Sequence, residues 1–348
     1  MRRARGSRIF TNRRKGGKGF ARIITFLVVL GLLFVFGAGI WLASFATTAV
    51  DVPKGKLYFN IDRGLGVGQV AHRLEADGLV TDTGAFVVLV RLLGKSGDIK
   101  AGSYLAEGSV TPLRLLDMLS RGEFAQGQIR FIEGWTFRQL RAALDAHPAL
   151  THETTGWSDA EILKRLGSEE RHPEGLFFPD TYQFSAGTSD LTILRQAYNK
   201  MQQVLDAAWE TRAEDLPVKT KYQGLILASI VEKETGDPSE REMVAAVFIN
   251  RLRKGMRLQT DPTVIYGLGE SFDGNLRKRD LLADQPYNTY TRYGLPPTPI
   301  ALPGKAAIDA TFRPAKTDAL YFVAKGDGTH HFSNNLKDHN RAVDQFQR

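Results

Sequence analysis

The sequence predicts an α+β protein that follows a single N-terminal transmembrane helix. Three observations lead to this expectation. Residues 23–50 carry no charged side chain over 28 positions. Strand-like segments followed by amphipathic helices recur between residues 61 and 150. Helical patterns dominate residues 152–256, and turn-rich segments with a short strand come after them. Helices with short strands around them are typical of the α+β class.

The positive charge of the chain is concentrated at its start. The formal net charge is +8, with 46 Lys and Arg against 38 Asp and Glu. Residues 1–22 hold nine of the basic residues and no acidic one, so 37 basic residues face 38 acidic ones in the remainder. That remainder is electrostatically ordinary, and nucleic acid is not an expected partner. We expect residues 1–22 to form a basic cytoplasmic tail.

The uncharged segment is long enough to cross a bilayer. About 20 residues span the hydrocarbon core of a membrane, and we expect residues 23–46 to be the transmembrane helix. A cleaved signal peptide is the alternative, because "ASFATTA" offers small residues, but the apolar region of a signal peptide is usually only about 7–15 residues long. The basic tail predicts a single-pass protein with its N-terminus in the cytoplasm and the rest outside. The chain has no cysteine, which excludes disulfides, zinc–thiolate sites and thiol catalysis.

A weak internal repeat follows the membrane segment. Residues 61–80, 105–124 and 131–150 each begin like a strand, pass through a glycine and continue as an amphipathic helix. Such β-turn-α units resemble LysM peptidoglycan-binding modules, although plain β-α packing units give the same pattern. We expect a LysM-like subdomain over residues 55–130.

The remainder of the chain reads mainly as helix. Helical patterns cover most of residues 152–220, apart from an aromatic and proline-rich loop at 172–184. Another helix is expected over residues 239–256. Near the end we expect a closing strand at 319–333, and after it a surface helix.

The segment "LILASIVEKETG", residues 225–236, carries an apolar helix into two carboxylates. The C-terminal end of a helix disfavours negative charge by roughly 0.3–1 kcal/mol for an exposed group. At 100° per residue, Glu234 falls about 20° from Leu227, in the middle of the apolar stripe. Glu232 falls on the opposite side of the helix, and Gly236 is the expected C-terminal stop.

Glu234 is therefore the candidate catalytic residue. A carboxyl group in an apolar face at the end of a helix has two reasons for a raised pKa, namely desolvation and the helix dipole. A general acid needs a proton that is retained near neutral pH. The alternative is a buried ion pair with Arg251, Arg253 or Arg257, which would have no catalytic role.

Polar and aromatic residues after 256 are further candidates. Arg257, Gln259, Thr260 and Asp261 crowd an expected helix start, which Thr260 or Asp261 would cap. They could line a sugar site or close a corner between two helices. The tyrosines and prolines of residues 286–304 suit stacking on sugar faces, and they also suit packing.

The histidines near the end of the chain do not predict a metal site. His330, His331 and His339 lack the spacing of known metal motifs, and neighbouring residues of a strand point to opposite faces. We expect structural roles for all three and no bound metal.

Five segments form long, ordered motifs, and together with the anchor they resemble one family. They are "PEGLFFPDTY" (173–182), "LASIVEKET" (227–235), "VFINRLRKGMRLQTDPTVIYGLG" (247–269), "YNTYTRYGLPPTPIALPG" (287–304) and "YFVAKGDGTHHFS" (321–333). These motifs resemble the MltG (YceG-like) endolytic murein transglycosylases of bacteria. The resemblance covers nearly all of the chain from about residue 50 onward. It implies a LysM-like subdomain in the first repeats and a YceG-like catalytic domain over residues 131–348.

The resemblance also implies a function. The catalytic glutamate of the family is the second acid of an E-K-E-T string, which is Glu234 here. The implied enzyme is a lytic transglycosylase, a lyase that cuts the MurNAc-GlcNAc bond within nascent glycan strands, leaves 1,6-anhydro-MurNAc ends and limits strand length without a cofactor. Its implied place is the inner membrane with a periplasmic catalytic domain, and its implied partners are peptidoglycan strands and peptidoglycan synthases. The further residues expected to bind or orient the glycan are Glu174, Asp180, Tyr182, Gln259 and Asp261.

Two other functions stay open. A non-catalytic wall-binding scaffold could use the LysM-like units, but it would need no acid on an apolar stripe. A hydrolase of the muramidase type would need a second carboxylate about 5–9 Å from the first. Glu174, Asp180 and Asp261 are the candidates for that second carboxylate.

Overall fold

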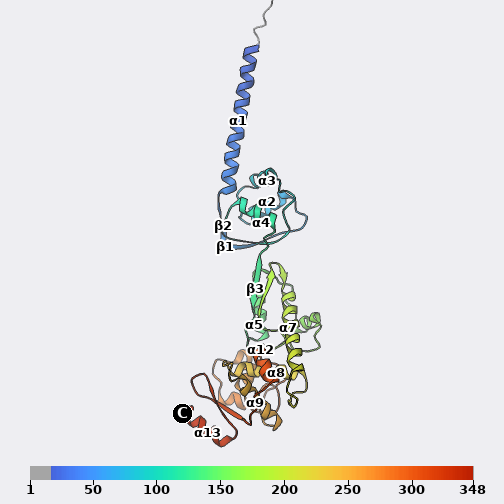
Figure 1. Ribbon diagram of the computed structural model, residues 1–348, viewed down its shortest axis with the longest axis vertical. Helices are drawn as coiled ribbons and strands as arrows, with labels where there is room; N and C mark the ends of the chain where they lie inside the picture. Colours follow the sequence, from blue (N-terminus) through green and yellow to red (C-terminus); the bar gives the residue numbers. More distant parts are fainter. Residues whose placement is uncertain (1–16, 348) are drawn as a thin grey trace, which may run out of the picture. The chain divides into compact units, whose positions relative to one another are not determined.

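The structure is a computed structural model that describes residues 17–347, with side chains from Arg22 onward. The chain divides into two compact units, which we call unit 1 (up to Ala125) and unit 2 (from Gln126) (Figure 1). The described residues form helices and four two-stranded sheets, joined by loops, which confirms the α+β class. Residues 1–16 of the expected basic tail lie outside the described part of the chain.

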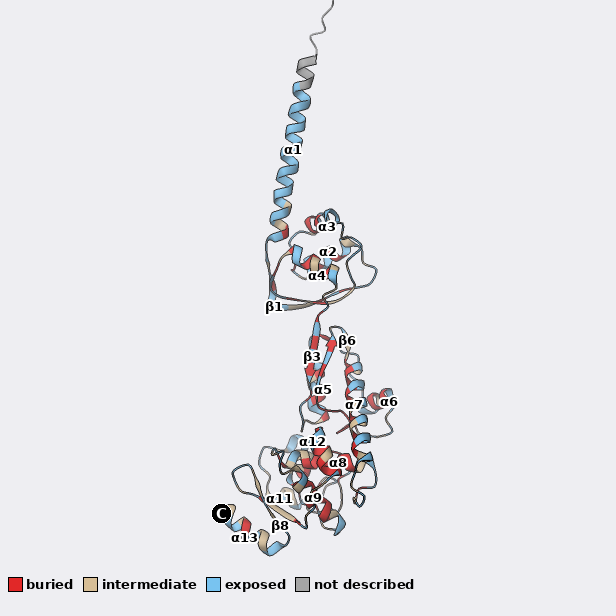
Figure 2. Ribbon diagram, viewed as in Figure 1, coloured by how far each residue is buried: buried red, intermediate tan, exposed pale blue. Residues whose placement is uncertain are grey.

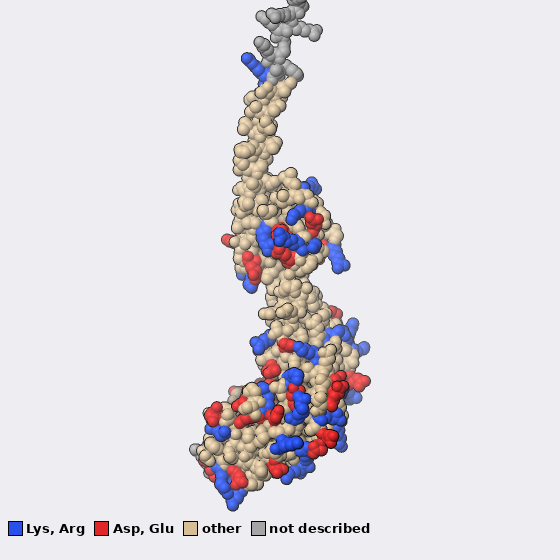
Figure 3. All heavy atoms as spheres, viewed as in Figure 1, with Lys and Arg blue, Asp and Glu red and all other residues tan. Residues whose placement is uncertain are grey.

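A long apolar helix, α1 (Gly17–Thr47), opens the described chain. Its stretch from Arg22 to Thr47 is 26 residues long and apolar enough to cross a membrane, and it is the one such helix found among residues 17–347. After Arg22, the surface of α1 carries no charged side chain up to the end of the helix at Thr47 (Figure 3). The helix contains the whole of the expected transmembrane span, residues 23–46.

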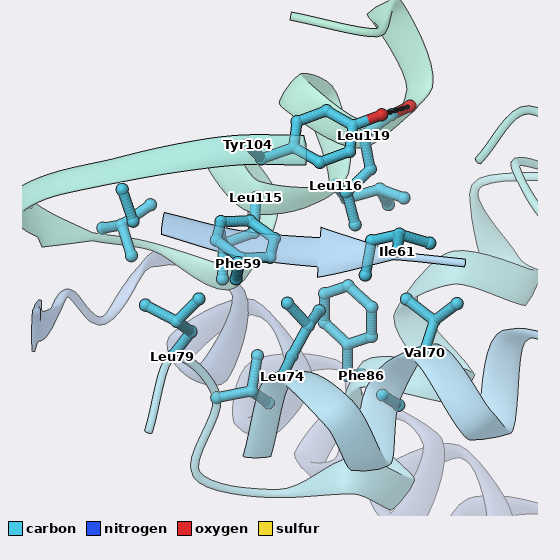
Figure 4. Close-up of a cluster of buried hydrophobic side chains, with 14 of the residues drawn as sticks. Phe59, Ile61, Val70, Leu74, Leu79, Phe86, Tyr104, Leu115, Leu116 and Leu119 are labelled. Atoms are coloured by element: carbon cyan, nitrogen blue, oxygen red, sulfur yellow. Dashed lines mark hydrogen bonds between the residues drawn. The ribbon is translucent and has the colours of Figure 1, made fainter. Parts of the chain in front are cut away.

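Unit 1 continues with two strands and three short helices around one core. The strands β1 and β2 pair antiparallel, with a bulge between Asp51 and Lys56. The apolar side chains of both strands and all three helices meet in a single cluster (Figure 4). Helix α4 is delimited by its sequence, because Thr111 accepts a hydrogen bond from the Arg114 amide at 3.1 Å and Gly122 adopts a left-handed conformation at φ 71°. The elements are β1 (Val50–Ile61), α2 (Val67–Ala76), α3 (Thr83–Leu92), β2 (Gly102–Val110) and α4 (Pro112–Arg121).

The three predicted β-turn-α repeats are present as β1–α2, β2–α4 and β3–α5. An additional helix, α3, follows the first repeat before the next strand begins. The boundary between the two units falls after the second repeat, so the third repeat opens unit 2. The LysM-like character of unit 1 stays a prediction.

Unit 2 is mainly helical, with three small sheets. Strands β3 and β5 pair antiparallel, β4 and β6 pair parallel, and β7 and β8 pair antiparallel. The elements are β3 (Gln126–Arg130), α5 (Phe137–Asp145), β4 (Leu150–Thr151), α6 (Asp159–Leu166), β5 (Thr181–Ser185), β6 (Thr188–Ser189), α7 (Asp190–Glu210), α8 (Lys221–Glu234), α9 (Arg241–Arg253), α10 (Asp261–Leu268), the 3-10 turn η1 (Gly269–Ser271), α11 (Lys278–Leu282), α12 (Lys305–Phe312), β7 (Tyr321–Ala324), β8 (His330–Ser333) and α13 (Leu336–Phe346).

Helix α8 is the central element of unit 2. Every residue from Gly224 to Val231 is buried, and α7, α9, α10 and α12 all contact the helix (Figure 2). Gly224 permits this packing, because a Cβ atom there would lie 2.2 Å from the Phe312 ring of α12. The predicted apolar stripe is buried, and the burial extends all round this part of α8 because neighbours cover it on every side.

The end of α8 differs from expectation. The helix stops at Glu234, and Thr235 is extended with φ −138° and ψ 132°. Gly236 is not left-handed, so the predicted glycine stop is wrong. The Asp237 amide instead donates to the Thr235 hydroxyl at 3.0 Å, which closes the turn after the helix.

The end of the chain forms a hairpin instead of the single expected strand. Strands β7 and β8 pair from Tyr321↔Ser333 to Ala324↔His330. The turn between them contains Gly326 and Gly328, both with positive φ (85° and 90°), a conformation that glycine adopts without strain. The tertiary structure thus reverses the chain in the middle of a segment that was expected to continue straight.

Candidate active site

A cavity of about 570 Å³ in unit 2 contains the predicted catalytic residue. Glu234 reaches it from the end of α8, and the start of α10, the β7–β8 hairpin and α13 supply other parts of its wall. Among the described residues its lining consists of Glu234, Phe248, Arg251, Leu258, Gln259, Asp261, Tyr290, Tyr321, Phe322, Val323, Ala324, His330, Leu336, His339, Asn340, Val343 and Gln347. Helix α13 is the expected surface helix, and one of its faces borders this cavity.

The surroundings of the Glu234 carboxyl group raise its pKa, so that it holds its proton at a higher pH than an exposed glutamate. Burial is the largest effect and raises the pKa of Glu234 to about 7, and the negative charge of Asp261 acts in the same direction. A hydrogen bond from Thr260 and the positive charges of His330 and Arg251 act the other way. The net result is a carboxyl group that is about half protonated near neutral pH.

Thr260 is the hydrogen-bond partner of that carboxyl group. Its hydroxyl donates to Glu234 Oε1, while Thr260 occupies the N-cap position of α10 without capping the helix through its side chain. Two further buried threonines surround it: the Thr263 hydroxyl donates to the Thr260 carbonyl at 2.8 Å, and the Thr260 amide donates to the Thr289 hydroxyl at 3.1 Å. The N-cap hydroxyl is thus directed toward the candidate acid and not toward its own helix.

Arg251 does not neutralise Glu234 by direct contact. Its guanidinium is buried and donates from Nε to the Leu320 carbonyl at 2.7 Å and from Nη1 to the Leu258 carbonyl at 2.8 Å. Within residues 17–347 no ion pair joins Glu234 to any of the three arginines considered above. The alternative of a buried ion pair is therefore wrong for this carboxylate.

Gln259 and Asp261 lie in the wall of the same cavity. Gln259 has a left-handed backbone at φ 51°, a conformation that non-glycine residues rarely adopt and that is often found at functional sites. The Tyr290 hydroxyl donates to Asp261 Oδ1 at 2.5 Å. Of the carboxylates weighed as a partner of Glu234, Asp261 is the one that lines the cavity.

The remaining predicted binding residues have partners elsewhere in unit 2. Glu174 is buried, where it accepts the Phe137 amide at 2.8 Å and the Tyr266 hydroxyl at 3.0 Å. Asp180 pairs with Lys200. The buried Tyr182 hydroxyl donates to the Phe178 carbonyl at 2.7 Å. None of Glu174, Asp180 and Tyr182 is among the residues that line the cavity.

The other acid at the end of α8 has a separate task. Glu232 accepts the amide of Gly304, the N-cap residue of α12, at 2.9 Å, and burial raises its pKa. The positive end of the α12 dipole also stabilises a carboxylate at this position. Glu232 and Glu234 thus contact different helices, α12 and α10, which agrees with their predicted positions on opposite sides of α8.

A histidine and a carboxylate form a pair at the edge of the cavity. His330 Nδ1 lies 2.7 Å from Glu240 Oε2, and the His330 backbone amide donates to Glu240 Oε1 at 2.8 Å. Only 13% of each side chain is exposed. His339 stacks on Tyr321 with ring centroids 5.1 Å apart. These contacts give His330 and His339 packing partners, yet both also border the cavity.

Two residues considered in the sequence for other roles come to the cavity from segments distant in the chain. Tyr290 was a candidate for stacking on sugar or for packing, and His330 was expected to be structural, but no spacing indicated that they would line the same cavity as Glu234. The cluster of the described chain that could hold a metal ion lies elsewhere and consists of Asp145, His152 and Asp190. Asp190 accepts the Thr154 hydroxyl at 2.7 Å, which is an internal structural contact.

A comparison with protein-family models matches residues 59–345 to the YceG-like family. The chain belongs to the YceG-like family. One relative, the endolytic murein transglycosylase of Bacillus subtilis (strain 168), is 31% identical over 90% of this chain and 91% of its own. An endolytic murein transglycosylase of Streptococcus pneumoniae serotype 2 is 29% identical over 93% of this chain and 64% of its own length.

A solved YceG-like structure supports the fold. The crystal structure of a putative YceG-like protein from Listeria monocytogenes matches 83% of this chain and 99% of its own, with a TM-score of 0.53 and 29% sequence identity. The YceG-like match includes most of unit 1, the whole cavity wall up to Val343, and Glu234.

Proposed function

We propose that this YceG-like chain is a membrane-anchored endolytic murein lytic transglycosylase with Glu234 as its catalytic residue. The observation that carries the proposal is a partly buried carboxyl group with a pKa of about 7, placed in the wall of a cavity of about 570 Å³. A group with that pKa can both give and take a proton at neutral pH. The names of the relatives in Bacillus and Streptococcus support the same reaction.

One carboxyl group suffices for the proposed reaction. Protonated Glu234 gives its proton to the glycosidic oxygen between MurNAc and GlcNAc, and the bond from that oxygen to C1 of MurNAc breaks. The resulting carboxylate then takes the proton of the C6 hydroxyl of the same MurNAc, whose oxygen bonds to C1. Glu234 ends the cycle protonated, and the products are a free GlcNAc hydroxyl and a 1,6-anhydro-MurNAc end, with no water consumed.

The surroundings of Glu234 suit these two proton transfers. The Thr260 hydroxyl can stay hydrogen-bonded to the carboxyl while its protonation state alternates. Asp261 and Tyr290 hold each other at 2.5 Å in the cavity wall, where they would orient hydroxyl or acetamido groups of the glycan, together with Gln259. Glu174, Asp180 and Tyr182 would act on the glycan only indirectly, through the packing that they provide.

Anchoring would limit where the enzyme cuts. The apolar α1 helix supports attachment to a membrane, and nine basic residues before position 23 favour a cytoplasmic N-terminus. We infer an inner-membrane protein with a periplasmic catalytic unit, a LysM-like unit 1 that contacts peptidoglycan, and peptidoglycan synthases as neighbours. Cutting nascent strands close to the membrane would limit their length.

A hydrolase is the second candidate, because Asp261 lines the same cavity and could activate a water molecule. Product masses separate the two reactions. The full chain in detergent should convert uncross-linked glycan strands into anhydro-ended fragments, one water lighter than hydrolysis products. Glu234→Gln should lower kcat by about 10²–10⁴-fold, and Glu232→Gln is the matched control that should keep cutting.

Three outcomes would contradict the proposal in different ways. Reducing-end products that disappear with Asp261→Asn would establish a hydrolase. Full activity of Glu234→Gln would place the catalytic acid elsewhere. Binding of strands by the wild type without any cleavage would leave a wall-binding scaffold.

A further inference from the structure

Helix α3 of unit 1 is apolar on two sides. One side faces the core of the unit, where Phe86 packs among side chains of β1 and α2 (Figure 4). The other side exposes Val88 and Leu92, which are 46% and 70% accessible, and Leu93 just after the helix is 48% accessible. A surface helix of a water-soluble domain normally has polar residues on its outer side. The outer side of α3 therefore lacks an apolar partner within the described unit.

The exposed side of α3 continues onto α4. Leu113 is 43% accessible, and with Leu93 it lines a hollow of about 430 Å³ between the two helices. Cations surround the hollow: Lys95, Arg114 and Arg121 all lie within 4 Å of Asp117, at 3.9, 3.4 and 2.9 Å. We call Val88, Leu92, Leu93 and Leu113 the apolar patch.

The end of α1 is part of the same unit. Ala46 belongs to its buried core, and Leu42 and Phe45 pack against that core. Both α3 and α4 contact α1 directly. In Figure 1, α3 lies on the side of unit 1 from which the apolar part of α1 extends. The patch and the anchor are thus adjacent parts of one folded unit.

The length of α1 leaves no spacer between its membrane-spanning part and the folded core of unit 1. About 20 residues fill the hydrocarbon core, so a helix that enters after Arg22 leaves it near Trp41, whose half-exposed ring suits the membrane interface. The residues that pack on unit 1 start at Leu42. The folded core of unit 1 therefore begins where the bilayer ends, and the elements of that core that contact α1 must lie at the lipid headgroups.

We propose that the apolar patch inserts into the interface of the membrane that α1 crosses. Val88, Leu92, Leu93 and Leu113 would contact the acyl boundary, while Arg91 and Lys95 would reach the headgroup phosphates, as in interfacial amphipathic helices. This second contact would fix how unit 1 is oriented on the membrane. The inference rests on the proposed anchoring by α1, and it adds a lipid-binding surface to it.

The absence of cysteine from the chain permits a direct test. The full chain, with one cysteine carrying an environment-sensitive fluorophore, is reconstituted into vesicles of phosphatidylethanolamine and phosphatidylglycerol that contain a lipid with a shallow acyl spin label. With Leu92→Cys, we expect a blue-shifted emission and loss of most of it by quenching. Asn60→Cys is the matched exposed control near the far end of β1, and its emission should stay solvent-like and unquenched.

A label on α1 distinguishes failure of the membrane anchor from failure of the apolar patch to insert. Val35→Cys should be protected from water and quenched by deep spin labels, and failure there would overturn the anchoring itself. If Val35→Cys inserts while Leu92→Cys stays solvent-like, the docking surface is wrong. A blue shift at Leu92→Cys without lipid quenching would mean that another protein surface covers the patch, which also overturns the proposal.

A charged variant tests the patch without relying on a label in α3. Val88→Glu/Leu92→Glu should abolish the lipid quenching of a probe at Leu113→Cys. Both replaced side chains are exposed, so the far-ultraviolet circular dichroism should not change. Unchanged quenching in the charged variant would contradict insertion of α3.

Discussion

Two opposing effects act on the pKa of Glu234: burial raises it, and a hydrogen bond from Thr260 lowers it. Burial raises the pKa to about 7, while the Thr260 hydroxyl stabilises the charged form. The balance between these two effects places the pKa close to neutrality, where a single group can alternate between acid and base. Thr260 is therefore the residue through which the proton affinity of the candidate catalyst can be adjusted.

The pH dependence of cleavage tests this balance. Because the first proton transfer needs protonated Glu234, kcat/KM should fall as the pH rises through about 7. Thr260→Val removes the donor, so the pKa of Glu234 should rise further and the basic limb of the profile should move to higher pH. Thr260→Ser keeps a hydroxyl and should retain the wild-type limb. A limb that Thr260→Val leaves in place, or moves to lower pH, would contradict the assignment.

At the scale of elements, two buried carboxyl groups hold α10 near its two ends. Glu234 accepts from Thr260 at the N-cap, and Glu174 accepts from Tyr266 in the last turn of α10 and from Phe137 at the start of α5. Glu174 thereby connects two helices that are far apart in the chain. This contact explains why an acid outside the cavity occurs in the motif "PEGLFFPDTY".

The stability of unit 2 should depend on pH through Glu174. Burial raises its pKa from 4.5 to about 7, so the folded chain binds a proton more tightly than the unfolded chain. Stability is then fully present below pH 4.5 and is lost as the pH rises to about 7. At roughly 1.4 kcal/mol per pKa unit the loss is about 3 kcal/mol. Glu174→Gln has no titrating group at this position, so it should not lose this stability as the pH rises. At pH 8 it should be more stable than the wild type.

Urea unfolding followed by tryptophan fluorescence measures this effect, because Trp135, Trp157 and Trp209 all lie in unit 2. Asp180→Asn is the contrasting control: its pairing with Lys200 lowers the pKa of Asp180, so this variant should lose stability at pH 8. Equal pH dependence in Glu174→Gln and the wild type would show that Glu174 is not the titrating group.

At the scale of the whole molecule, the anchor and the first unit share residues. Leu42, Phe45 and Ala46 pack on the core of unit 1, and Val50 pairs with Val110 at the start of the sheet. The last turns of α1 are therefore part of a folded unit as well as the end of an apolar span. A chain that begins at residue 51 lacks these contacts.

Truncation should consequently weaken unit 1 and leave unit 2 unchanged. We expect unit 1 to lose about 1–3 kcal/mol in a chain that begins at residue 51, compared with one that begins at residue 41, since apolar side chains of α1 are no longer buried. Hydrogen exchange of the β2 amides measures the loss, and the tryptophan fluorescence of unit 2 is the internal control. Equal protection of β2 in both chains would mean that the end of α1 does not stabilise the unit.

Local periodicity and composition predicted several features of this protein. The apolar span and the three β-α repeats follow from residue spacing along one strand or helix, and the structure contains both. The choice of Glu234 over Glu232 follows from the same kind of spacing and stays a prediction, although Glu234 does line the cavity. The motifs also sufficed for the expected family, which the YceG-like match confirms. These properties depend on neighbours within a few residues, which the sequence records directly.

The surroundings of Glu234 depend on contacts that form when unit 2 folds. Its burial comes from helices that cover α8 on every side, its donor comes from the start of α10, and its cavity is completed by Tyr290, His330 and α13. The hairpin turn at Gly326 and Gly328 and the internal contacts of Glu174, Asp180 and Tyr182 were equally absent from local patterns. Such contacts join residues tens of positions apart, and the free energy that selects them arises from packing of the whole unit, which no short stretch of sequence contains.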